Sequence, residues 1–166
     1  MKNKKRVLYL CNAAVIAALY VALTMLSSLL GLSSGAIQCR FSEALCILPY
    51  FTPAAIPGVT LGCLISNLTV AGTSPFDIVF GTLATLIGAV GTYLLRNIKI
   101  GKFLAALPPI VSNTLIIPFV LKYAYSLPDG IGFLMLTVGI GELISAGVLG
   151  TLLLFALEPY KEKIFK

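Results

Sequence analysis

The chain has 166 residues, of which 58% are hydrophobic and 11% are charged, and its formal net charge is +6. Soluble domains carry about a quarter charged residues to keep their surfaces hydrated, so this composition excludes a water-soluble globular domain. The chain has no histidine, and its four cysteines lack metal-ligand spacing. The basic residues flank apolar runs instead of forming one stripe. These features argue against a metal site and against a nucleic-acid partner.

The first apolar run, residues 7–30, follows a basic segment and predicts a transmembrane helix. It is too long for the apolar region of a signal peptide, so we expect no cleavage. Ala14, Ala18 and Ala22 recur in it at four-residue spacing and form a flat stripe that lets another helix approach closely. The partner of this stripe is either a helix of the same chain or another subunit.

The second run, residues 41–72, is too long for one span and contains helix-breaking residues near its middle: Pro49, Pro53, Pro57 and Gly58. It therefore predicts two short helices, at 41–52 and 56–72. Three later runs predict one span each, at 75–95, 103–124 and 131–157. In hydrocarbon, such long continuous runs can satisfy their backbone groups only as helices. The sequence thus predicts an all-α integral membrane protein with six transmembrane helices in a single domain, residues 1–166.

The basic residues test the number of spans, because cytoplasmic loops carry the excess of Lys and Arg and each added span inverts the loops after it. Six spans place ten basic residues in the cytoplasm and leave Arg40 and Lys122 outside, whereas five spans place five inside and seven outside. The charges therefore favour six spans. We expect a multi-pass protein of the cell membrane with both termini in the cytoplasm.

Several polar residues are expected near the outer ends of these helices. Arg40 and Glu43 lie three residues apart, on one helical face, with Gln38 just before them. They form either an ion pair that anchors the helix or part of a binding site. Asn67 and Asp77 should lie at similar depth, and Asp77 also suits a helix cap.

Glu142 and Asn113 are expected deeper in the membrane, about 18 Å and about 15 Å from the outer ends of their helices at ~1.5 Å per residue. A charged group at such depth is costly and is a functional candidate by default. Gly139 and Gly141 precede Glu142 and leave room for a close helix or a flat ligand. An ionised carboxylate suits paired N–H donors such as a guanidinium-like edge. A purely structural role for Glu142 is the alternative.

The chain has no GxxxxGK[ST] phosphate loop and no soluble domain, so any ATPase must be a partner. Three stretches, AALYVALT (17–24), IQCRFSEAL (37–45) and GTSPFDIVFGTLATLIGA (72–89), resemble the queuosine-precursor (QueT) family. The chain is similar, over nearly its whole length, to the S components of energy-coupling factor (ECF) vitamin transporters. This resemblance implies a substrate-binding subunit and not an enzyme.

The resemblance implies a 7-deazaguanine ligand, such as queuine or its precursors, captured from outside. It also implies that Ala14 and Ala18 contact the transmembrane T subunit, which docks two ABC-type ATPases. Glu142 would then accept the guanine-like edge, and Asn113 would bind the carbonyl or ring nitrogen. The other candidates would line or close the outer mouth: Gln38, Arg40, Glu43, Asn67 and Asp77. No cofactor is expected.

Three alternatives remain open at this point. The chain could be an S component for another small vitamin. It could be a stand-alone carrier or channel, although only Glu43, Asp77 and Glu142 are available for a proton path. It could also be a purely structural or assembly subunit, in which Glu142 has no role in binding small molecules.

Overall fold

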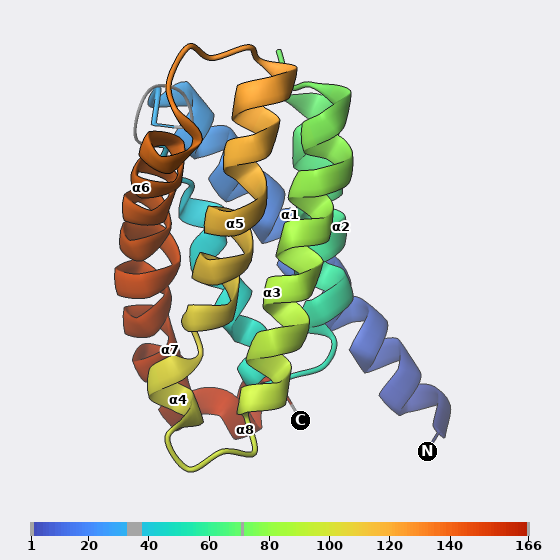
Figure 1. Ribbon diagram of the computed structural model, residues 1–166. Coiled ribbons are helices and arrows are strands. Elements are labelled where there is room, and N and C mark those ends of the chain that lie inside the picture. Colours follow the sequence, from blue (N-terminus) through green and yellow to red (C-terminus); the bar gives the residue numbers. More distant parts are fainter. Residues whose placement is uncertain (1, 33–37, 71, 166) are drawn as a thin grey trace.

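The computed structural model describes residues 2–32, 38–70 and 72–165, and within these ranges every regular element is helical (Figure 1). The elements are α1 (Lys2–Leu29), the 3₁₀ helix η1 (Phe41–Tyr50), α2 (Ala55–Thr69), the π-helical turn η2 (Asp77–Gly81), α3 (Thr82–Leu95), α4 (Gly101–Leu104), α5 (Leu107–Ala124), α6 (Ile131–Glu142), the π-helical segment η3 (Leu143–Gly150), α7 (Thr151–Leu157), the 3₁₀ turn η4 (Glu158–Tyr160) and α8 (Lys161–Ile164).

Four helical stretches are long and apolar enough to cross a membrane: Asn3–Leu29, Asp77–Leu95, Gly101–Ala124 and Ile131–Ile164. The helices η1 and α2 are shorter, about 20 Å and about 22 Å at their usual rises, against a hydrocarbon core of about 30 Å. The all-helical fold and several membrane-spanning helices predicted from the sequence are therefore confirmed. That η1 and α2 form two of six crossings stays a prediction.

The second apolar run is divided between η1 and α2, as expected, but the details differ from the prediction. The first part is a 3₁₀ helix and ends at Tyr50, and the break covers residues 51–54. Pro57 and Gly58 do not interrupt helix α2, because they lie in its first turn. There the missing N–H of proline has no helical hydrogen-bond partner to lose.

The short helix η1 lies in the interior of the bundle. Its residues Ser42 to Pro49 are all buried, and its apolar side chains share a core with residues of five other helices, including Tyr20, Val59 and Leu154. Neighbouring helices enclose it on all sides, so Glu43, near its start, is held in a nearly water-free environment. This placement positions the polar cluster described below.

Close packing of α1 on α2 depends on two glycines spaced four residues apart. A Cβ atom on Gly58 would lie 2.9 Å from Ile16 Cβ, and one on Gly62 would lie 2.6 Å from Tyr20 Cβ. The backbones can therefore approach only because these positions lack side chains. The contact buries Ala13 and Ala17 and sets the position of Tyr20.

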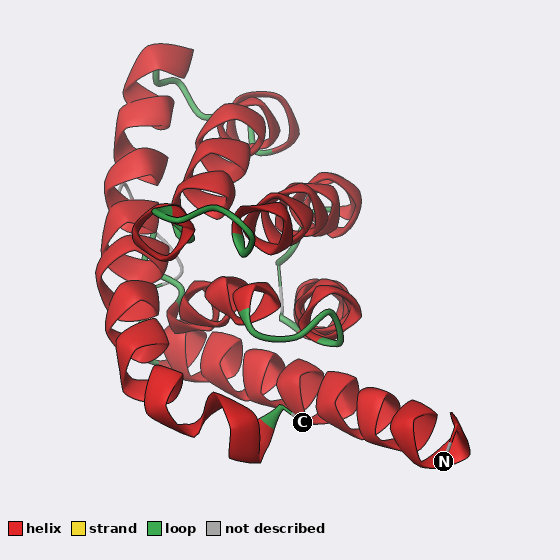
Figure 2. Cartoon of the chain, turned by 90° about the horizontal axis from the view of Figure 1, so that it is seen from below, coloured by secondary structure: helices red, strands yellow, loops and turns green. Residues whose placement is uncertain are grey.

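Both chain ends and the α3–α4 connection lie at one end of the bundle (Figure 1). We call this the basic end. It carries Lys4, Lys5, Arg6, Arg96, Lys99, Lys102, Lys161 and Lys163. The α5–α6 connection lies at the opposite end. Helix α1 extends past the other helices at its N-terminal end, as Figures 1 and 2 both show.

The α1–α2 contact makes a direct prediction. Gly62→Ala should lower the free energy of unfolding by about 1–3 kcal/mol, since the new methyl group overpacks the site against Tyr20. Gly132→Ala is the matched control, because a Cβ there has no atom within 4 Å, and it should be neutral or slightly stabilising. Thermal unfolding of both purified variants in detergent measures the difference. Equal stability of the two would contradict the close packing.

Candidate functional site

A buried carboxylate, Glu43, stands at the centre of the polar cluster. It is 3% exposed and lies in the first turn of η1. Tyr20 on α1 donates its hydroxyl to Glu43 Oε1. Glu43 Oε2 accepts from the Cys46 thiol at 3.2 Å and from Asn113 Nδ2 at 3.4 Å. Both carboxylate oxygens are therefore satisfied within the protein, as burial requires.

A second carboxylate, that of the partly buried Glu142, shares the same asparagine. Asn113 Nδ2 donates to Glu142 Oε1 at 3.0 Å, so the amide of α5 lies between the carboxylates of η1 and α6. Glu142 Oε2 is buried, and no group of the described residues donates a hydrogen bond to it. An unpaired buried acceptor costs about 1–3 kcal/mol, and more when it is charged. Glu142 Oε2 is therefore the atom of the cluster that lacks a donor.

The structure thus brings Glu43 together with Glu142 and Asn113, which the sequence placed deeper in the membrane. Glu43 was expected at the outer mouth, but it shares Asn113 with Glu142. The reason is that η1 is folded into the bundle and is not laid along its surface. The segment just before η1 also packs closely on α6, since a Cβ on Gly141 would lie 2.0 Å from the Gln38 carbonyl oxygen. Cys39 Sγ also lies 3.1 Å from Ser145 Oγ on η3.

Arg40 does not form the ion pair with Glu43 that its spacing suggested. Among the described residues the one salt bridge joins Lys102 to Glu158 at the basic end, at 3.6 Å. Arg40 precedes η1 as its N-cap residue in extended conformation, so it does not share a helical face with Glu43. Its positive charge nevertheless acts on Glu43, Asp77 and Glu142 through space.

Asp77 and Asn67 belong to a second polar cluster. Asn67 Nδ2 donates to the Asp77 carbonyl oxygen at 3.1 Å, and the Tyr125 hydroxyl donates to Asp77 Oδ2. Asp77 makes no cap hydrogen bond, so the capping interpretation is wrong. The Tyr125 oxygen also accepts from the Ser74 amide at 2.9 Å. Burial and the Asp77 carboxyl group raise the pKa of Tyr125. This cluster ties the α2–α3 connection to the end of α5.

The alanines of α1 lie on two sides of the helix, one buried and one exposed. Ala13 and Ala17 are buried against α2, whereas Ala14, Ala18 and Ala22 are exposed. Packing inside the described part of the chain therefore uses the neighbouring alanines and leaves the predicted stripe exposed.

Sequence reasoning missed Tyr20, Cys46 and Tyr125. Tyr20 lies in an apolar run and resembles a packing residue. A buried tyrosine hydroxyl usually has a hydrogen-bond partner. Tyr20 lies on the face of α1 that contacts Gly62, and this position is the available signal that its hydroxyl binds a polar group. Within the described ranges, no group of His, Cys, Asp and Glu suits a metal ion.

The chemistry of the first cluster is that of an acceptor. Both amide hydrogens of Asn113 point to glutamates, and both oxygens of Glu43 are occupied. The free oxygen of Glu142 can accept a hydrogen bond but cannot donate one while it is ionised. The cluster therefore suits a ligand edge that is rich in N–H groups.

Comparison with known proteins points to a transport protein. A family model described as QueT transporter matches residues 10–159. The curated "Queuosine precursor transporter QueT" of Lactococcus lactis subsp. cremoris (strain MG1363) is 39% identical over 85 residues, which are 51% of this chain. The match spans about half of that relative, 49% of its length. No solved structure matches the chain.

The second cluster predicts how the α2–α3 connection is held. In Tyr125→Phe the Ser74 amide loses its acceptor, so its hydrogen exchange should accelerate by about tenfold or more if the net bond is worth ~1.4 kcal/mol. Hydrogen exchange read out by mass spectrometry or NMR measures this effect. The control is Tyr123→Phe, two residues away and 74% exposed, which should leave Ser74 unchanged. Unchanged exchange in Tyr125→Phe would show that the tyrosine does not restrain this connection.

Proposed function

Because the chain belongs to the QueT transporter family, whose model covers residues 10–159, we propose that it captures a queuosine precursor at the membrane for import. The proposed ligand is a 7-deazaguanine base such as queuine. The observation that carries this proposal is the buried, unpartnered Oε2 of Glu142 beside Asn113. The name of the Lactococcus relative supports the same class of ligand.

A guanine-like edge complements Glu142 in geometry and in hydrogen-bond polarity. It presents a ring N–H and an exocyclic amine side by side, which one carboxylate can accept as a bidentate pair. Such a ligand would supply the donor that Oε2 lacks and would remove the cost of an unpaired acceptor. A base without the exocyclic amine would restore one bond at most.

Asn113 must adjust for the bidentate pair to form, since its amide now occupies Glu142 Oε1. It also reaches Glu43 Oε2, at 3.4 Å. We propose that ligand binding moves the amide fully onto Glu43 and frees both oxygens of Glu142. Tyr20 and Cys46 hold Glu43 in place during this exchange. The expected contact of Asn113 with a ligand carbonyl would require one of its present bonds to open.

The remaining candidates form the proposed outer mouth: Gln38, Arg40, Asn67 and Asp77. Arg40 interacts electrostatically with Asp77 in this mouth and with Glu43 and Glu142 in the deeper cluster, so one positive charge is set against three carboxyl groups. This balance favours a ligand whose side arm carries a positive charge, such as an amine. The Gln38 main chain already lies against α6 next to Glu142, so the segment before η1 is placed to cover the base.

Energy for import would come from partners. We propose that the chain is an S component of an ECF transporter with six spans, both termini in the cytoplasm and a location in the cell membrane. The exposed Ala14, Ala18 and Ala22 would contact the T subunit, which docks two ABC-type ATPases. Their small side chains support this proposal because they let a second helix approach closely. An S component for another small vitamin and a stand-alone carrier are the competing functions.

Ligand binding tests the role of Glu142. Glu142→Gln should weaken queuine binding by at least about tenfold, or about 1.4 kcal/mol, since an amide replaces one of the two acceptor oxygens by an NH₂ donor and cannot form the bidentate pair. The control is Glu158→Gln at the basic end. Isothermal titration with queuine and with a 7-deazapurine lacking the exocyclic amine should show a preference for queuine that Glu142→Gln reduces. Unchanged queuine affinity in Glu142→Gln would refute this role.

A thermal-shift panel of queuine, riboflavin, thiamine and biotin tests the ligand class separately. Stabilisation by riboflavin, thiamine or biotin alone would assign the chain to another vitamin. Queuine should be the one that stabilises the wild-type protein.

Assembly tests the alanine stripe. Ala14→Trp and Ala18→Trp should abolish co-purification with the T subunit and leave queuine affinity unchanged, because a bulky side chain blocks close helix approach. Leu136→Trp is the control, since Leu136 is 61% exposed on α6, away from the stripe. Normal assembly of both alanine variants would place the partner surface elsewhere.

A further inference from the structure

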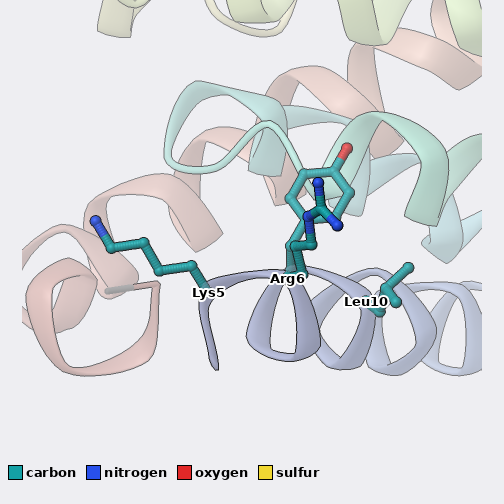
Figure 3. A pocket seen from close by; sticks show the side chains of 4 residues that line it. Lys5, Arg6 and Leu10 are labelled. Carbon is teal, nitrogen blue, oxygen red and sulfur yellow. The ribbon is translucent and has the colours of Figure 1, made fainter. Parts of the chain in front are cut away.

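A pocket of about 490 Å³ opens at the basic end, beside the N-terminal part of α1, and is lined by Lys5, Arg6, Tyr9 and Leu10 (Figure 3). All four lining residues belong to α1, so the pocket is a wide, open depression on the protein surface, and its walls are mainly apolar. The four residues are paired one helical turn apart, Lys5 with Tyr9 and Arg6 with Leu10, so they share one side of the helix. Figure 3 shows Arg6 between Lys5, whose side chain extends to one side, and Leu10 on the other side.

The surroundings give the pocket a wall and a positive field. The Tyr9 hydroxyl donates to the Pro53 carbonyl oxygen at 3.4 Å, which places α1 against the connection between η1 and α2. Phe51 in that connection stacks on Phe165, with ring centroids 5.5 Å apart, so the end of the chain lies there too. The neighbouring α8 adds Lys161 and Lys163 around Glu162.

The two cations of the pocket are not neutralised by a carboxyl group in the described part of the chain. The salt bridge found there occupies Glu158 with Lys102, and neither Lys5 nor Arg6 forms one. The apolar side of the pocket is equally open, since Leu10 is 65% exposed. The site therefore combines free cations with free apolar surface, at the end of a membrane-spanning helix.

We propose that this pocket binds one anionic phospholipid. Its phosphate would bind Lys5 and Arg6, which offer a point charge and a planar fork of donors, and its acyl chain would lie along Leu10. Neither half of the ligand alone would satisfy the site, because a free anion leaves the apolar wall uncovered. A neutral lipid leaves the cations unpaired. The proposal does not depend on the ligand or the energy source of the proposed function.

The experiment measures lipid retention by the full chain. Protein reconstituted in nanodiscs of phosphatidylcholine with a minor fraction of phosphatidylglycerol is released and examined by native mass spectrometry. Wild-type protein should keep one phosphatidylglycerol. The double variant Lys5→Ala, Arg6→Ala should lower this retention by about tenfold or more, given the attraction of juxtamembrane cations to anionic lipid.

A matched control removes two charges from the same end without touching the pocket: Arg96→Ala with Lys99→Ala. This pair should keep the bound lipid. Equal loss in the two double variants would show non-specific attraction to a basic protein and would overturn the proposal. Leu10→Asn should weaken retention while the charge stays constant.

Two further results would also overturn it. Inorganic phosphate could stabilise the wild type in detergent, measured by thermal shift, as much as phosphatidylglycerol does, which would indicate a site for free anions. The Lys5 and Arg6 variant could also keep its lipid but fail to assemble with the ATPase-bearing partner, which would indicate a protein-binding surface. Queuine binding should be unchanged in the Lys5 and Arg6 variant. Failure of the lipid proposal is therefore distinguishable from failure of the proposed function.

Discussion

Two glutamates share one asparagine amide inside an apolar bundle, and most of the polar architecture follows from this arrangement. A buried carboxyl group requires hydrogen-bond donors, and Glu43 receives them from three different helices: Tyr20 on α1, Cys46 on η1 and Asn113 on α5. Glu142 receives only one. This imbalance distinguishes a carboxyl group that is held in place from one that has an acceptor to offer.

Glycine contacts make this arrangement possible. Gly58 and Gly62 bring α1 close enough to α2 for Tyr20 to reach Glu43. Gly141 admits the main chain of Gln38 against α6, next to Glu142. A methyl group at any of these three positions would meet neighbouring atoms at 3.0 Å or less. Residues without side chains thus determine where the charged residues lie.

Helix α1 carries features of different kinds on its different sides. Its buried side supplies Tyr20 and Thr24, and Thr24 donates to Ser42 Oγ at 2.8 Å. Its exposed side carries the alanine stripe, and its N-terminal turns carry the basic pocket. The proposed substrate site, partner surface and lipid site would therefore share one rigid helix, and a change in its tilt would reach all three.

The sequence alone indicated that this protein lies in a membrane, that it is all-helical and roughly where its helices begin and end, because hydropathy and proline placement act locally along the chain. It also placed Glu142 and Asn113 at similar depths, since depth in a membrane helix follows from residue count. Tertiary structure alone decided that Glu43 joins them, that Arg40 does not pair with Glu43, and that Asp77 binds Tyr125. The first two depend on how η1 folds into the bundle, and the third depends on the packing of the α2–α3 connection against the end of α5. A local pattern does not encode such contacts.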